Sequence, residues 1–137
     1  MAKNAMPVSR ARTAYGLLSE IRKLILEEPK RYDQTAWRYK WPVGCQEAPA
    51  CGTTACVAGW VVTLKVPDFS AYQHSFEDEG ARVLGLSPAA AEALFDGNAA
   101  KERGDGRRDI LRHAKRGAAH IARFQKKYAK QLRSKRV

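Results

Sequence analysis

Residues 106–137 read GRRDILRHAKRGAAHIARFQKKYAKQLRSKRV, and this stretch decides how the rest of the chain is interpreted. It holds twelve lysines and arginines against a single acid, Asp109. The other 105 residues carry thirteen basic and thirteen acidic side chains, so the whole net charge of +11 belongs to this stretch. Charge concentrated in this way favours an anionic partner.

Apolar side chains recur in the same stretch at helical spacing. One side of a helix drawn at about 100° per residue collects Leu111, Ala114, Ala118, Ile121, Tyr128 and Leu132, flanked by Ile110, Ala122 and Phe124. Away from this stripe lie the cations that we call the basic ridge: Arg112, Lys115, Arg116, Arg123, Lys126, Lys127, Lys130 and Arg133. The pattern predicts a long amphipathic helix that buries its apolar face in the core and exposes the basic ridge. We expect the last four residues to fray, as chain ends often do.

Two further helices are predicted in the first half of the chain. One begins with Ser9 as a candidate N-cap and runs to about Glu28, where Pro29 stops it. The other follows an N-cap at Thr53 or Thr54, and its small and apolar residues continue all the way round the helix. A helix without a polar face is typical of the centre of a core.

Two shorter helices are predicted at residues 77–84, which Gly85 ends, and at residues 87–95, which open with Ser-Pro. No segment predicts a strand. The fold class is therefore all-α: one domain over residues 1–137 with about five helices, preceded by a flexible leader at residues 1–8. A hydrophobic fraction of 45% is enough for one core in a chain of this length.

The sequence predicts a cytoplasmic protein that does not engage a membrane. Its basic start lacks the apolar run of a secretory signal, and no segment approaches the roughly 18 consecutive apolar residues that span a bilayer. Three cysteines, an odd number, fit a reducing compartment better than a secreted disulfide framework.

Two strings in the middle of the chain carry a resemblance to a known group of proteins. They are CGTTACVAGW at residues 51–60, and ARVLGLS at residues 81–87 followed by ALF at residues 93–95. Together they resemble small, functionally unassigned proteins of actinobacteria and their phages that share a Cys-Gly-Thr-x-x-Cys-x-Ala-Gly motif. The resemblance covers about residues 32–96 and leaves the basic stretch outside. It implies a phage or mobile-element origin and carries no activity with it.

Cys51 is the candidate catalytic residue. A thiol just before a helix N-terminus has a lowered pKa and an exposed sulfur, which suits a nucleophile. However, His74 follows after only 23 positions, and His113 and His120 come after Asn98, so the papain-like order of cysteine, histidine and asparagine is not met. The chain is therefore predicted to be a non-enzyme, with a Cys51-dependent enzyme kept as an alternative.

No metal and no cofactor are predicted. Cys45, Cys51, Cys56 and His74 are zinc ligands by type, but their spacing does not match the Cys-x2-Cys pattern of a zinc knuckle.

Aromatic residues alternate with cations over residues 31–43. Trp37 and Trp41 are candidate anchors for a partner or stacking surfaces for bases, and a place in the core is the alternative for both.

The favoured function is a non-enzymatic binding protein whose basic ridge engages nucleic acid or a nucleoprotein through phosphate contacts. The alternative is a phage-type effector that binds an acidic host protein with the same ridge.

Overall fold

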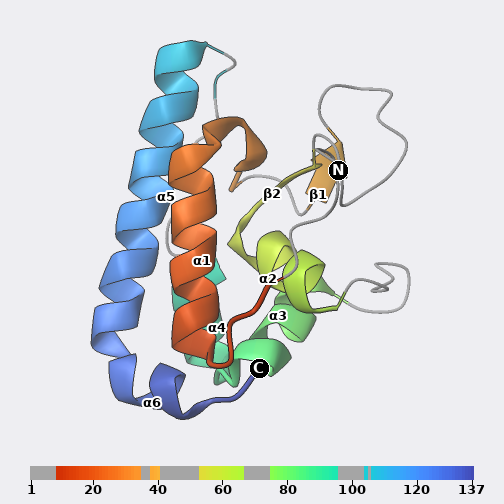
Figure 1. Ribbon diagram of the computed structural model, residues 1–137, viewed down its shortest axis with the longest axis vertical. Coiled ribbons are helices and arrows are strands. Elements are labelled where there is room, and N and C mark those ends of the chain that lie inside the picture. Colours follow the sequence, from red (N-terminus) through yellow and green to blue (C-terminus); the bar gives the residue numbers. More distant parts are fainter. Residues whose placement is uncertain (1–8, 35–37, 41–52, 67–74, 96–103, 105) are drawn as a thin grey trace.

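The computed structural model describes residues 9–34, 38–40, 53–66, 75–95, 104 and 106–137, and in this part the chain is mostly helical (Figure 1). Its elements are α1 (Ala14–Glu27), a 3-10 turn η1 (Pro29–Arg31), β1 (Arg38–Lys40), β2 (Thr53–Ala55), α2 (Val57–Lys65), α3 (Phe76–Leu84), α4 (Pro88–Phe95), α5 (Arg107–Lys127) and α6 (Ala129–Ser134). The predicted all-α class is confirmed. The strands β1 and β2, which the sequence did not predict, form one short antiparallel pair with Arg38 opposite Ala55.

The core lies between the paired helices α1 and α5, which run side by side in Figure 1, and the shorter helices α2 to α4. Helix α1 contributes its buried stripe of Leu17, Leu18, Ile21 and Ile25. Helix α2 is buried on all sides from Val57 to Thr63, which confirms the prediction that it forms the centre of the core. Trp60 within it is fully buried, and its indole N–H donates to the Arg31 carbonyl at 2.7 Å.

Helix α1 begins later than predicted. Its N-cap is Thr13, whose hydroxyl accepts from the Gly16 N–H at 3.1 Å, whereas the Ser9 hydroxyl accepts from the Ala11 N–H ahead of the helix. The helix ends at Glu27, just before Pro29, as predicted, because proline cannot supply the N–H that the next turn requires.

The predicted cap at Thr53 or Thr54 is wrong. These two residues pair with β1, and α2 begins only at Val57, with the Cys56 sulfur accepting from the Gly59 N–H at 3.3 Å. Strand β2 is held further by a bond from the Asp33 N–H to the Ala55 carbonyl at 3.1 Å. The partner strand is distant in sequence, so local capping preferences did not indicate it.

The short helices follow the local signals closely. Helix α3 starts one residue before the predicted position and ends at Leu84. Its C-cap is Gly85, whose φ of 68° is the left-handed conformation that glycine adopts without strain. The Ser87 hydroxyl accepts from the Ala90 N–H at 3.2 Å and opens α4 before Pro88.

The C-terminal segment differs from the prediction in two ways. Helix α5 ends at Lys127 and a separate helix α6 follows, which packs against α1 and brings Leu132 into the core. The last residues do not fray: the Ala14 N–H donates to the Lys135 carbonyl at 2.9 Å, and the Val137 N–H donates to the Arg12 carbonyl at 3.1 Å. The end of the chain is thus tied to the start of α1.

Candidate nucleic-acid interface

One face of α5 is buried in the core. It consists of Ile110, His113, Ala114, Gly117, Ala118, Ile121, Phe124 and Gln125. Most of the predicted apolar stripe is among them, but Leu111 is not: its side chain is 40% exposed. Contacts on two sides set the rotation of α5: Tyr32 contacts His113 and Gly117, and Gln125 donates to Tyr15 and Ser19 of α1. Leu111 lies outside the face that these contacts bury.

A polar cluster beneath α5 fixes this rotation. The Gln34 backbone N–H donates to His113 Nε2 at 3.0 Å, and the Gln34 side-chain amide donates to the Phe95 carbonyl at 2.5 Å. Gln34 Oε1 accepts from the Tyr32 hydroxyl at 2.9 Å and from the Val57 N–H at 3.2 Å. Four segments of the chain therefore meet at one glutamine.

The two histidines of α5 do not belong to the basic ridge, although both lie among its cations in the sequence. His113 is 7% exposed and lies with its ring centroid 4.9 Å from that of Tyr32. Since its Nε2 accepts from an N–H, that nitrogen carries no proton. His120 is partly buried, and its Nε2 lies 2.9 and 3.1 Å from the carbonyl oxygens of Ala93 and Leu94, so this nitrogen is the donor. Both rings therefore join α5 to the rest of the fold.

All eight residues of the basic ridge are exposed, as predicted: Arg112, Lys115, Arg116, Arg123, Lys126, Lys127, Lys130 and Arg133. Arg107 and Arg108, also exposed, extend the cationic surface to the start of α5. From Arg108 to Lys127 this surface covers about 28 Å along the helix, at 1.5 Å per residue. Both arginines belong to the basic stretch of residues 106–137 but lie outside the predicted ridge.

The cations of the ridge are not neutralised by neighbouring acids in the described part of the chain. Ion pairs there join Lys23 to Glu27, Arg31 to Glu28 and Arg82 to Glu79, whereas no ridge cation takes part in one. Two of them lie over aromatic rings instead: Lys127 Nζ is 5.5 Å from the ring centroid of Tyr128, and Arg133 Cζ is 4.4 Å from that of Tyr15. Tyr15 and Tyr128 thus support the far end of the ridge.

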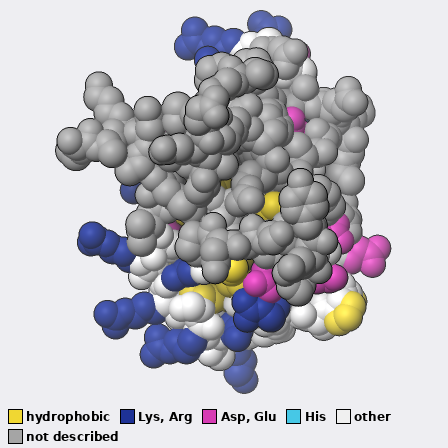
Figure 2. All heavy atoms as spheres, turned by 90° about the vertical axis from the view of Figure 1, so that its right-hand side faces the viewer, with side chains coloured by type: hydrophobic (Ala, Val, Ile, Leu, Met, Phe, Trp, Pro, Cys, Tyr) yellow, Lys and Arg dark blue, Asp and Glu magenta, His cyan; other side chains and the backbone are white. Residues whose placement is uncertain are grey.

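On the other side of the molecule, the described residues have a mixed charge. Figure 2, a view from the side opposite α5, shows acidic and basic side chains next to one another. The first turn of α3 supplies Glu77, Asp78 and Glu79, and Arg82 binds Glu79 through two nitrogens at 2.6 and 3.0 Å. Cations thus predominate on α5 and α6, whose one acid is Asp109.

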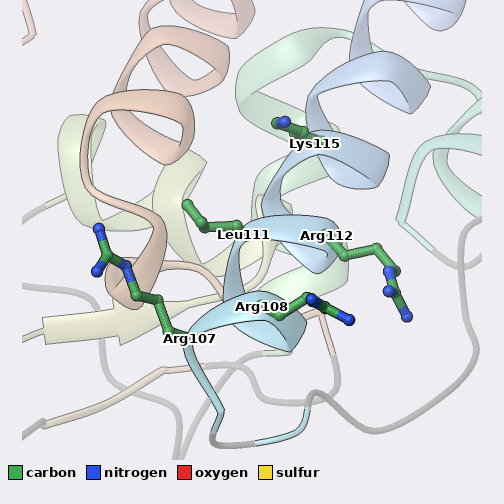
Figure 3. A pocket seen from close by; sticks show the side chains of 5 residues that line it. All are labelled: Arg107, Arg108, Leu111, Arg112 and Lys115. Carbon is green, nitrogen blue, oxygen red and sulfur yellow. The ribbon is translucent and has the colours of Figure 1, made fainter.

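Two open pockets flank Leu111 at the start of α5, and they share Leu111 and Arg107. One lies on the outer side of the helix and is lined by Arg108, Arg112 and Lys115 as well; the other faces η1 and is lined also by Ile110 and residues 28–31. In Figure 3 the side chain of Arg107 runs toward α1, those of Arg108 and Arg112 extend to the opposite side, and Leu111 lies between them.

Most residues of the other candidate sites are not among those that the structure describes. Cys51, Trp37 and Trp41 lie outside the described residues, as do Cys45 and His74 of the candidate zinc set. The fourth member of that set, Cys56, is buried in the core at the N-terminus of α2, where burial raises the pKa of its thiol to about 11. Among the residues that are described, no three histidine, cysteine, aspartate or glutamate side chains come together as a metal site would require.

None of the described helices has both the length and the apolar character needed to cross a bilayer. Comparisons with protein-family models, curated proteins and solved structures find no match. The resemblance to actinobacterial and phage proteins and the cytoplasmic location stay predictions.

Proposed function

We propose that the basic ridge binds nucleic acid through the phosphate backbone. The observation that carries this proposal is the exposure of eight cations on α5 and α6 with no acidic partner for any of them among the described residues. Unpaired cations in a row give a strong positive potential, and a polyanion that binds there releases its condensed counterions.

The composition of the surface favours phosphate contacts over the reading of base edges. The two glutamines of α5 and α6 are both engaged within the fold: Gln125 donates to the Tyr15 carbonyl at 2.9 Å, and Gln131 to the Gly85 carbonyl at 3.1 Å. Lysines and arginines remain, and these position a protein on a nucleic acid backbone with little dependence on sequence. Binding is therefore expected to be broad in sequence and steep in its dependence on salt.

The test compares two triple variants of equal charge. Arg112→Gln, Arg116→Gln and Arg123→Gln remove three cations from the ridge, and Arg10→Gln, Arg12→Gln and Lys23→Gln remove three exposed cations elsewhere. Fluorescence anisotropy with a labelled 20-base-pair duplex over a series of salt concentrations gives the slope of log affinity against log salt. The ridge variant should lose nearly three from this slope, at about 0.9 per lost contact, whereas the control variant should stay close to wild type.

Three results would overturn the proposal. One is a wild-type protein that does not bind duplex or single-stranded nucleic acid at about 100 mM salt. Another is equal loss in both triple variants, which would mean that net charge alone matters. The third is nuclease-resistant co-purification of one acidic protein that the ridge variant no longer captures, which would assign the ridge to a protein partner.

Deletion of residues 106–137 is not a usable test, because α5 and α6 bury one face each in the core. A shortened chain would lose its fold together with its charge, so substitutions at exposed positions are required.

A further inference from the structure

Leu111 has an environment that the fold itself does not explain. It is one of two large hydrophobic side chains that the described residues leave exposed, the other being Leu26, at 40% and 48% exposure respectively. Leu26 lines neither of the pockets at the start of α5, whereas Leu111 lines both. We call these two pockets together the Leu111 groove.

The groove combines an apolar floor with a cationic rim. Pro29, Ile110 and Leu111 supply the apolar surface. Lysines and arginines surround it on both sides, and Glu28, the acid in the lining, lies 3.6 Å from Arg31 in an ion pair. The two parts have volumes of about 640 and 690 Å³, within the range of small-ligand pockets.

We propose that the Leu111 groove binds an unpaired nucleotide of a single strand, with the base against Leu111 and the adjoining phosphates on Arg107 and Arg108. This inference rests on the proposed function and adds a preference for single-stranded nucleic acid. A duplex exposes phosphates but keeps the faces of its bases stacked, so it has nothing to place on an exposed leucine. An unpaired base has an apolar face next to a charged backbone, which is the combination that the groove presents.

The position of the groove also favours this occupant. Arg112 and Lys115 line its outer pocket and belong to the basic ridge, so a strand whose base occupies the groove can continue along α5 toward Arg123. The phosphates of such a strand face cations along α5. Its base contacts Leu111, and this apolar contact is the one that does not depend on salt.

The experiment uses the full chain and two probes, a labelled single strand of twenty thymidines and a labelled 20-base-pair duplex. Leu111→Ala should weaken binding of the single strand about fivefold without changing its salt slope, because an apolar contact is lost and no counterion is involved. Binding of the duplex should not change. Leu26→Ala is the matched control and should leave the affinity for both probes at the wild-type value.

A second measurement does not require a variant. A strand that carries 4-thiothymidine is crosslinked to the wild-type protein by light, and trypsin then releases the peptide Asp109–Arg112 that contains Leu111. Crosslinks concentrated on this peptide support the groove, and crosslinks confined to residues 123–137 contradict it. Far-UV circular dichroism of Leu111→Ala shows that any lost affinity does not come from unfolding.

The outcomes separate this inference from the proposed function. Unchanged single-strand affinity in Leu111→Ala, or an equal loss for duplex and single strand, overturns the groove while the ridge still binds phosphate. Failure of the wild-type protein to bind either probe overturns the proposed function itself, and the groove with it.

Discussion

Gly117 of α5 lies so close to Tyr32 that a Cβ added to the glycine would be 2.5 Å from the ring carbon Cζ. A glycine inside a 21-residue helix costs about 1 kcal/mol relative to alanine, so its presence needs a reason. The reason is Tyr32, which is fully buried and occupies the space where a side chain would be.

Gly117→Ala should therefore destabilise the protein although alanine favours helix. The steric cost of overpacking, typically 1–3 kcal/mol, outweighs the gain of about 1 kcal/mol in propensity. We expect a net loss of up to about 2 kcal/mol, measured by urea unfolding. The control is Ala119→Gly at an exposed position of the same helix, which measures the difference in helix propensity between alanine and glycine alone. A more stable Gly117→Ala protein would show that Tyr32 moves aside without cost.

Because of Cys56, we expect the folded protein to lose stability at alkaline pH. Burial raises the pKa of its thiol from 9.0 to about 11. Below pH 9 the thiol is neutral in both states; between pH 9 and about 11 it ionises in the unfolded chain first, which lowers the free energy of unfolding by roughly 2–3 kcal/mol in total. The comparison of wild type with Cys56→Ala from pH 8 to 11 isolates this effect. Parallel pH profiles for the two proteins would contradict it.

The same burial makes Cys56 unreactive in the native state, because the thiolate is the nucleophile. At pH 7.5, iodoacetamide should label Cys56 only after denaturation, with peptide mapping to separate the three cysteines. Selective native-state labelling of Cys51 would support the alternative of a cysteine-dependent enzyme, and an inert Cys51 would end it.

Replacement of Gln125 by glutamate should give a protein whose stability depends on pH. Its side chain is 1% exposed, its amide donates to the Tyr15 carbonyl and to the Ser19 hydroxyl at 2.8 Å, and within the described residues its Oε1 has no partner. Gln125→Glu keeps the shape but buries a charge without a counter-ion, so we expect a loss of about 3 kcal/mol at pH 7. Burial raises the pKa of the new carboxyl, so this loss should shrink as the pH falls and protonates it.

The control for this variant is Gln131→Glu, because Gln131 is exposed in α6. The substitution removes the exposed hydrogen bond from Gln131 to the Gly85 carbonyl, so its effect should stay within about 1 kcal/mol and should be the same at either pH. A Gln125→Glu protein as stable at pH 7 as the control would mean that water reaches the site.

The end of the chain should contribute measurably to stability. Removal of residues 135–137 deletes the backbone bonds to Ala14 and Arg12, which at about 1 kcal/mol each gives a loss of about 2 kcal/mol. Arg136→Gln changes the charge and keeps both bonds, so its melting temperature should match wild type. If the truncated and the full chain melt together, these contacts add nothing to the folded state.

Much of the fold could be predicted because its signals are local. The periodicity of residues 106–137 indicated which cations face solvent, since a helix that buries its apolar stripe must expose the opposite side. Gly85 and Ser87 marked the boundary between α3 and α4 through conformations and caps that depend on a few neighbouring residues.

The errors concern contacts between distant segments. Leu111 matches the apolar spacing as well as Ala114 does, but Tyr32 and α1 set the rotation of α5 and leave Leu111 outside. His113 lies between the cations Arg112 and Lys115 in the sequence, yet a backbone N–H 79 residues away binds it in the interior. Nothing in the last residues themselves indicates that they are ordered, because their hydrogen bonds join them to Arg12 and Ala14 near the start of the chain.

The sequence by itself determined the helical class and the concentration of charge on one helix face, because both follow from residue type and a period of 3.6. The tertiary structure alone decided which residues border that face. Packing between distant segments fixes the rotation of a helix, and here it turned Leu111 toward solvent, between two cation-lined pockets at the start of the basic surface.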